Sequence, residues 1–360
     1  MTERPAKNKT HYLLWGFIIA LIIVFLMGTS LVTGLSLNSF QMLAQTKVAF
    51  RGISAYNQIR RKASQGYDVR VERAKWSQAL KAYQARQYSK ADRLVSDISH
   101  NLKESTKVGY RVYYRSSGDI TVSGLVFKPN RGSKPWPTIV VNHPGFGAAA
   151  DFSDIALLFR DHGYLTFCPD YRGGGKSRGK IELAKGEVDD VINGIEYLRT
   201  TGMVDDNHIG LYGQSHGAAI ALLVAARYRR IKAVVEASGF TDVAALYRYH
   251  AKNMGKSKLS KSLVYYFSLI GGTPDKVPKE YAVRSAVNYA NDIQAAVLII
   301  HGGKDPLIPV SQAEEMYKAL SNAGKTVEIK IYPNEGHGVR DPESSQELSG
   351  LTFSWFEKYL

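Results

Sequence analysis

The sequence predicts an α/β fold, a mostly parallel and doubly wound sheet, over roughly its last 250 residues. Short apolar runs such as 138–142 and 296–300 lead into glycine-containing loops, as buried parallel strands do. One run is followed at once by an alanine-rich helical stretch, 218–227. In addition, a serine, an aspartate and a histidine follow three such runs, at the sheet edge where α/β proteins bind ligands.

The N-terminus predicts a membrane segment. A tail, 1–11, carries Arg4, Lys7 and Lys9, and residues 12–40 contain no charge. About 20 apolar residues span a bilayer core, so 12–40 is predicted to be an uncleaved transmembrane anchor. A cleaved signal peptide is the rival, because small residues follow the apolar run. The basic tail favours a cytoplasmic N-terminus, although basic residues further along keep the opposite topology open.

Residues 41–107 are predicted to form a basic helical stalk or hairpin. They hold 14 Lys/Arg and 5 Asp/Glu, a net +9 of the chain's +15. Apolar residues recur at helical spacing on either side of a break at 87–89. The charge fits a solvated helix face, or attraction to anionic lipid or cell-wall polymer. Nucleic acid is not expected, because the basic residues share no stretch with a nucleic-acid module.

Ser215 is the predicted nucleophile. It stands in Gly213-Gln214-Ser215-His216-Gly217, between an apolar run and the helical stretch. A strand that turns sharply into a helix around an exposed serine needs glycine two places either side, because a Cβ there would clash. A structural turn that happens to contain a serine is the alternative.

Asp305 and His337 are its predicted partners. A serine hydroxyl needs a base to accept its proton and a carboxylate to hold that base in the right tautomer. Asp305 follows the run 296–300 and the loop His301-Gly-Gly-Lys, and His337 lies between glycines after the run 327–332. The alternative for Asp305 is a helix cap. The order Ser, Asp, His is that of α/β-hydrolases.

The oxyanion hole is predicted to use backbone N–H groups. One is that of His216, directly after the nucleophile. The second is expected from the loop 143–147, after the predicted strand 138–142, with Phe146 favoured and Gly145 next.

Several motifs together resemble a known family. They are Asp170-Tyr-Arg-Gly-Gly-Gly-Lys-Ser, the stretches 187–198 and 204–217, His301-Gly-Gly-Lys-Asp305 and Gly336-His337-Gly338. The chain resembles the catalytic domain of the prolyl oligopeptidase family and the related single-domain esterases of the acetyl xylan esterase and dienelactone hydrolase type. The resemblance covers about residues 108–360 and implies an α/β-hydrolase fold, an entry hairpin at 109–127, and the same three site residues.

The resemblance leaves the substrate class open. Family peptidases usually carry a β-propeller before the hydrolase domain, at about 40 to 50 residues per blade, which exceeds what residues 41–107 could form. An ester or small-amide substrate therefore fits at least as well as a peptide.

A lid-like insertion is predicted at about 241–292. It contains Tyr247, Tyr265 and Tyr266 as candidate substrate-binding residues, and 248–261 has five basic residues and no acidic one. Such a lid would admit an acyl chain or contact a membrane surface; a helix pair with its aromatic residues in the core is the alternative. No metal or other cofactor is expected, because no spaced Cys/His set or phosphate-binding loop occurs and Cys168 is the single cysteine.

These observations predict a single-pass, membrane-tethered serine hydrolase with an extracytoplasmic catalytic domain. It would cleave a small ester, amide or peptide through an acyl-enzyme. The alternative is a non-catalytic scaffold that keeps the hydrolase fold to bind a partner at the membrane. The sequence does not predict the oligomeric state.

Overall fold

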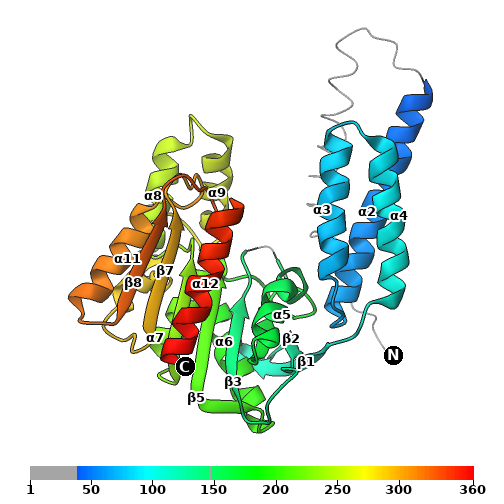
Figure 1. The fold of residues 1–360 in the computed structure, drawn as a ribbon. Coiled ribbons are helices and arrows are strands. Elements are labelled where there is room, and N and C mark those ends of the chain that lie inside the picture. Colours follow the sequence, from blue (N-terminus) through cyan, green and yellow to red (C-terminus); the bar gives the residue numbers. More distant parts are fainter. Residues whose placement is uncertain (1–38, 146) are drawn as a thin grey trace, which may run out of the picture. The chain divides into compact units, whose positions relative to one another are not determined.

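The computed structural model describes residues 39–145 and 147–360, which form two compact units (Figure 1). The smaller unit contains the described residues 39–56 and 74–99, and the larger unit contains 57–73 and 100–360. The predicted anchor, 12–40, lies almost wholly outside the described residues. No helix in the described part of the chain is both long and apolar enough to cross a membrane.

The smaller unit is built from parts of three helices, α2 (Ser39–Ser64), α3 (Arg70–Gln84) and α4 (Tyr88–Glu104). Val48, Ala82 and Ala91 form one cluster of its core, and Val95 and Ile98 of α4 are buried as well. Between α2 and α4, Arg51 donates to Asp92 at 2.5 Å.

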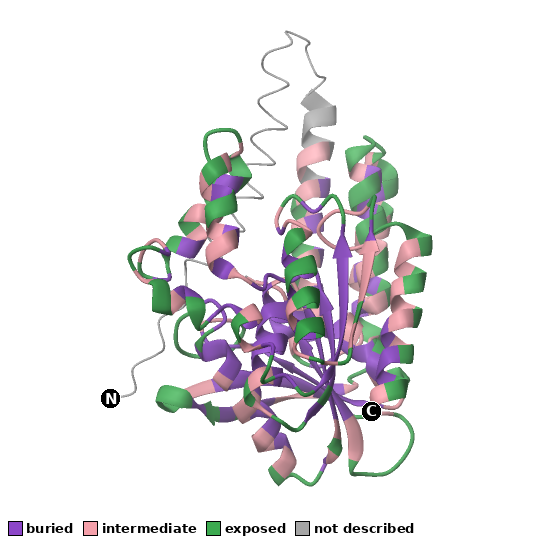
Figure 2. Ribbon diagram, turned by 90° about the vertical axis from the view of Figure 1, so that its left-hand side faces the viewer, coloured by how far each residue is buried: buried purple, intermediate pink, exposed green. Residues whose placement is uncertain are grey.

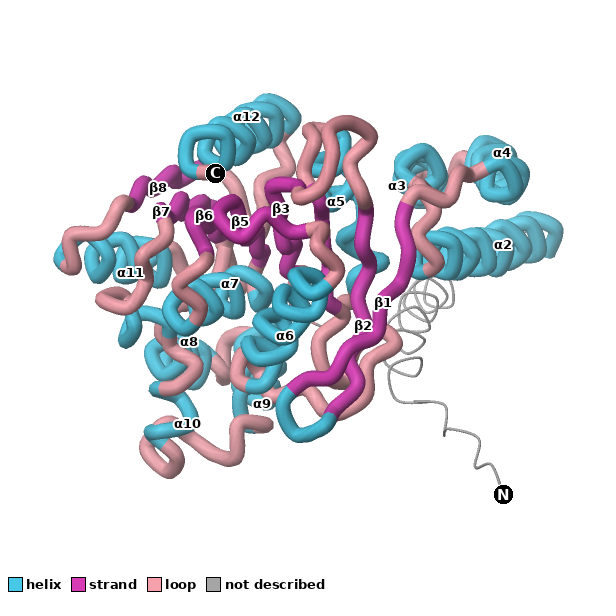
Figure 3. Tube along the Cα trace, turned by 90° about the horizontal axis from the view of Figure 1, so that it is seen from below, coloured by secondary structure: helices cyan, strands magenta, loops and turns pink. Residues whose placement is uncertain are grey.

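The larger unit contains one sheet of eight strands in the order β1-β2-β4-β3-β5-β6-β7-β8 (Figure 3). The hairpin β1–β2 pairs antiparallel with β4, and the strands from β4 to β8 are parallel to one another. The strands are β1 (Gly109–Ser116), β2 (Ile120–Phe127), β3 (Trp136–Asn142), β4 (Leu165–Pro169), β5 (Val204–Gln214), β6 (Ile231–Ala237), β7 (Ala296–Gly302) and β8 (Val327–Tyr332).

Helices cover both faces of the sheet. Figure 3 shows α5 (Ser153–Asp161) and α12 (Pro342–Tyr359) on one face, and α6 (Gly186–Thr200), α7 (His216–Arg227) and α11 (Ser311–Asn322) on the other. All residues of β4 and β7 are buried, as in a sheet covered on both sides (Figure 2). The predicted doubly wound α/β-hydrolase fold is confirmed.

The connection from β6 to β7 carries the helices of the predicted insertion. They are α8 (Val243–Asn253), α9 (Lys258–Ser268) and α10 (Pro278–Ala282), followed by a short 3-10 helix, Ala286–Tyr289. Two further 3-10 helices occur at Ser117–Asp119 and Ala149–Phe152.

Residues 57–73 are fastened to the rest of the larger unit by ion pairs around α5. The pairs are Arg60–Asp151 at 2.8 Å, Arg70–Asp161 at 2.8 Å and Arg73–Asp154 at 2.6 Å. The end of α2 and the start of α3 therefore belong structurally to the sheet-containing unit.

Candidate active site

Ser215 lies at the turn from β5 into α7, with a φ of 55° and a ψ of −120°. This is a left-handed backbone region that non-glycine residues adopt at a cost of about 1–3 kcal/mol. A Cβ at Gly213 would strike the Gly217 carbonyl oxygen, and a Cβ at Gly217 would strike that of Asn142. Both glycines of the pentapeptide are therefore required by backbone contacts, as the sequence predicts.

His337 bridges Ser215 and Asp305, which lie far from it in the sequence. Its Nε2 is 3.1 Å from Ser215 Oγ, and its Nδ1 is 2.7 Å from Asp305 Oδ2. The other oxygen of Asp305 accepts the backbone N–H groups of Leu307 and Ile308 at 2.8 and 3.0 Å. The structure thus brings together all three predicted side chains, with the carboxylate fixed by its own loop.

Other histidines near this site are buried and poorly suited to accept a proton. Burial, with a smaller contribution from His143, lowers the pKa of His216 to about 3. Burial also lowers the pKa of His143 and that of His301. His301 Nε2 lies 2.9 Å from the Ile308 carbonyl oxygen, so its ring supports the loop that carries Asp305.

The loop after β3 approaches the start of α7. A Cβ on Gly145 would lie 3.5 Å from the Cβ of His216, so the loop backbone runs beside the residue that follows Ser215. Phe146, the favoured second oxyanion donor, lies outside the described residues. The backbone N–H of His216 belongs to the first turn of α7, where N–H groups lack intrahelical acceptors.

Asp170 holds the far end of this loop, a role that was not assigned to it from the sequence. Its Oδ1 accepts the backbone N–H of Ala149 at 2.9 Å, and its Oδ2 accepts the Ser123 hydroxyl at 2.5 Å and an N–H of Arg111. Asp170 directly follows β4, so an acidic residue at the end of a buried strand was the available signal.

The three candidate tyrosines of the insertion have different surroundings. The Tyr266 hydroxyl would lie 3.4 Å from a Cβ at Gly145, and burial raises the pKa of Tyr266. Tyr265 is 72% exposed, and the Tyr247 ring packs 5.8 Å from that of Tyr281. The structure therefore brings only Tyr266 of the three next to the loop.

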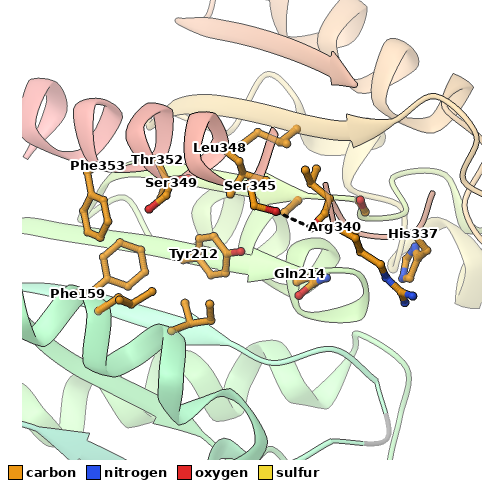
Figure 4. Close-up of a pocket in the computed structure, with 17 residues that line it drawn as sticks. Phe159, Tyr212, Gln214, His337, Arg340, Ser345, Leu348, Ser349, Thr352 and Phe353 are labelled. Carbon is orange, nitrogen blue, oxygen red and sulfur yellow. Dashed lines mark hydrogen bonds between the residues drawn. The ribbon is translucent and has the colours of Figure 1, made fainter. Parts of the chain in front are cut away.

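A cavity of about 390 Å³ lies between α5 and α12, and we call it the α5–α12 cavity. Figure 4 shows Phe159, Tyr212 and Phe353 at one end and His337 with Arg340 at the other. Its described lining comprises Ile155, Leu158, Phe159, Tyr212, Gln214, Ala237, Ser238, Ile300, His337, Gly338, Val339, Arg340, Ser345, Leu348, Ser349, Thr352 and Phe353. No local pattern in the sequence indicates this cavity.

Within 39–145 and 147–360, no group of three or more His, Cys, Asp or Glu side chains could hold a metal ion.

Sequence comparison identifies relatives of the larger unit. The pattern of the prolyl oligopeptidase family matches residues 150–360. A Bacillus subtilis (strain 168) protein, the uncharacterized peptidase YtmA, is 28% identical over 247 residues, which cover 68% of this chain and 91% of that protein.

Solved structures show the same fold. An acylaminoacyl peptidase of Pyrococcus horikoshii superposes with a TM-score of 0.61 at 21% identity, covering 74% of this chain and 44% of that one. The Pyrococcus furiosus esterase Pf2001 superposes with a TM-score of 0.56 at 20% identity, covering 70% of this chain and 90% of that one. The chain thus spans less than half of the peptidase and nearly all of the esterase.

Proposed function

Since this chain is a serine hydrolase that belongs to the prolyl oligopeptidase family, we propose that Ser215, His337 and Asp305 are its catalytic triad. The observation that carries the proposal is the pair of contacts of the His337 ring, 3.1 Å to Ser215 Oγ and 2.7 Å to Asp305 Oδ2. We further propose that its substrates are small esters and amides, cleaved through an acyl-enzyme.

Each side chain has a defined task in this mechanism. His337 Nε2 accepts the Ser215 proton as Oγ attacks the substrate carbonyl carbon. Asp305 keeps the Nδ1 proton in place, which leaves Nε2 free to act as the base, and it stabilises the imidazolium that forms. The nucleophile lies at the N-terminus of α7, where the helix dipole favours negative charge.

The negative charge on the carbonyl oxygen would be stabilised by two backbone N–H groups. One is that of His216, and the other comes from Gly145 or Phe146. Loss of one such donor typically costs about 3 to 4 kcal/mol of transition-state stabilisation. The position of the Tyr266 hydroxyl beside Gly145 supports a role for that side chain in substrate binding. For Tyr247 and Tyr265 the same role is proposed from the sequence alone.

The small-substrate proposal is supported by how much of each relative the chain matches. It covers 90% of the Pyrococcus furiosus esterase and 44% of the acylaminoacyl peptidase.

We propose a membrane location on the strength of the sequence. Residues 12–40 carry no charge and follow Arg4, Lys7 and Lys9, which favours a single-pass anchor with the hydrolase domain outside the cytoplasm. The basic segment 41–107 would then lie close to anionic lipid or cell-wall polymer.

Labelling with a fluorophosphonate tests the triad, because such probes react with an activated serine. We expect the wild type to be labelled on Ser215, and Ser215→Ala to lose both labelling and, on the order of a million-fold, kcat on an acetyl ester. Ser354→Ala, at an exposed serine of α12, should behave as the wild type.

Equal labelling of wild type and Ser215→Ala, or labelling of neither, would contradict the proposal and favour a non-catalytic scaffold. A matched panel of acyl esters and aminoacyl amides then separates esterase from peptidase activity.

A further inference from the structure

We propose that the α5–α12 cavity receives the leaving group of the substrate, and that this group is a neutral, apolar alcohol. The inference rests on the proposed function of Ser215 and His337, and it names the class of ester that the site prefers.

The cavity has the size and lining of a site for a small apolar group. Its volume of about 390 Å³ lies at the lower end of the range, about 300–1,000 Å³, of small-molecule sites. The Phe159 ring lies 5.7 Å from that of Tyr212 and 5.3 Å from that of Phe353. Phe159 and Phe353 lie farthest from His337, and Tyr212 lies next to them on the side of Gln214 (Figure 4).

A buried polar group in the wall points to a ligand. Thr352 is 3% exposed, and in the described part of the chain its Oγ1 has no hydrogen-bond partner. A buried hydroxyl without a partner is unfavourable, so most such groups are satisfied by protein, water or ligand. Thr352 lines the cavity from α12 (Figure 4), so a small shift of its side chain would let an ether, hydroxyl or water in the cavity bond to it.

The position of His337 distinguishes the leaving group from the acyl group. In acylation, a bond forms from Ser215 Oγ to the carbonyl carbon and the carbon–oxygen bond to the alcohol breaks. The proton that left Oγ passes through His337 Nε2 to the alcohol oxygen, so the alcohol must lie beside the imidazole. His337 lines the cavity, whereas Ser215, His216 and Gly145 are not part of its lining.

The one charged side chain in the described lining disfavours a cationic alcohol. Arg340 is the only Lys, Arg, Asp or Glu among the described lining residues, and no ion pair of its side chain occurs in the described part of the chain. A cation near this guanidinium would meet a like charge with no carboxylate in the wall to offset it.

The test uses acetate esters, which share one acyl group and differ in their alcohols. We expect kcat/KM for 2-phenylethyl acetate to exceed that for ethyl acetate by roughly 10- to 100-fold, because the phenyl group is buried. We also expect 3,3-dimethylbutyl acetate to react faster than its cationic isostere, acetylcholine, although choline is the better leaving group.

Filling the cavity should remove the preference. Ser349→Phe places a ring among the lining residues, so the 2-phenylethyl ester should lose its advantage while ethyl acetate is still cleaved. Ser354→Phe, the same change at an exposed position of α12 outside the lining, should leave the preference intact. Ser345→Leu, nearer His337, serves as a second filling variant should Ser349→Phe not fold.

Equal kcat/KM values along the alcohol series, or a preference that Ser349→Phe leaves unchanged, would overturn the proposed role of the cavity. The proposed hydrolase function of Ser215 and His337 would not be affected. The proposal would be overturned too if Ser349→Phe changed kcat/KM only along a series of ethyl esters that differ in their acyl groups, because the cavity would then hold the acyl group. Failure of wild type to cleave any ester would contradict the proposed function instead. Titration of Ser215→Ala protein with 2-phenylethanol, with and without Ser349→Phe, then decides independently whether the cavity binds an apolar alcohol.

Discussion

The orientation of the His337 ring depends on a carboxylate whose own position is fixed. One carboxylate oxygen of Asp305 accepts a hydrogen bond from His337 Nδ1, and the other accepts hydrogen bonds from two backbone N–H groups of its loop. His301, on β7, forms a hydrogen bond with the Ile308 carbonyl oxygen and so links that loop to the sheet. The proposed base is therefore held by a chain of contacts that begins in the sheet.

Glu236 is a buried acid beside the same turn. It is 0% exposed on β6, and burial raises its pKa to about 8. Its Oε1 accepts the backbone N–H of Gly239, while its Oε2 has no hydrogen-bond partner among the described residues. The side chain is thus protonated in the folded protein near neutral pH.

Glu236 predicts a loss of stability as pH rises. The unfolded carboxyl ionises near its ordinary value of 4.5 and the folded one near 8, so the folded state binds more protons in between. The free energy of unfolding should therefore fall by about 2 kcal/mol from pH 6 to pH 8 because of this group. Glu236→Gln should remove that fall, as measured by urea unfolding at several pH values.

The control for this prediction is Glu343→Gln, at an exposed glutamate, which should keep the wild-type pH dependence. If wild type and Glu236→Gln lose stability in parallel from pH 6 to pH 8, Glu236 is ionised in the folded protein and the prediction fails.

Which site residues were predictable depended on whether each followed a recognisable strand. Ser215, Asp305 and His337 each follow an apolar run, so their meeting at one sheet edge could be expected. Tyr265 and Tyr266 could not be distinguished, because neighbours on a helix point about 100° apart and the phase of α9 was unknown. Thr352 and Arg340 belong to a cavity between two helices distant in sequence, which no local pattern reveals.

Helix α6 is fixed to the turn after β4 by a buried ion pair. Arg172 donates its Nε and Nη2 to Asp190 of α6 at 3.0 and 2.9 Å, and Ser116 donates to the same carboxylate at 2.5 Å. Asp190 is 0% and Arg172 5% exposed. A Cβ on Gly186 would strike the Arg172 guanidinium, so the helix begins in contact with it.

Removing one partner of this pair should be costly. Asp190→Ala leaves Arg172 buried without its main acceptor, and we expect the free energy of unfolding to fall by about 3–5 kcal/mol. Asp206→Ala removes the partner of Arg199 at a partly exposed pair, and we expect a loss below about 1 kcal/mol. Denaturant unfolding of both variants measures the difference.

Two further results test whether burial of the Arg172–Asp190 pair causes the expected loss of stability. Arg172→Met with Asp190→Leu should recover much of the stability, since an apolar pair leaves no buried charge. Similar losses for Asp190→Ala and Asp206→Ala would contradict the role given to burial.

Elements with strong local patterns were predictable, and those with weak patterns were not. The runs 138–142, 296–300 and 327–332 correspond to β3, β7 and β8 within a few residues. Helix α2 was missed because its buried face is made largely of small residues, with Val48, Ala55, Ile59 and Ala63 in the core. Alanine contributes little to a hydrophobic pattern, even where it allows close packing.

For the whole molecule, the charge of 41–107 is partly neutralised by the protein itself. Arg51 pairs with Asp92 in the smaller unit, while Arg60 and Arg73 pair with Asp151 and Asp154 in the larger one. These arginines brace the fold, so only part of the charge of 41–107 is available for the proposed attraction to anionic lipid or polymer. Counts of Lys, Arg, Asp and Glu in the sequence cannot show which basic residues form ion pairs within the fold and which do not.

Removal of residues 1–38 tests the proposed anchor. We expect the full chain to partition into a detergent phase and the shortened chain to stay in the aqueous phase, because 13–26 supplies most of the apolar length. The kcat/KM on acetyl esters should agree within about twofold, since no residue of the triad is removed. Partitioning of both forms into the same phase would refute the anchor.

The turn at Ser215 also limits how this chain can change during evolution. Carbonyl oxygens occupy the space that a side chain at position 213 or 217 would need, so substitutions there would force three backbone segments apart. New substrate preferences must therefore arise around the turn, in the connection between β6 and β7 and in the faces of α5 and α12. Descendants of this sequence can diverge widely in what they cleave while the pentapeptide itself stays nearly constant.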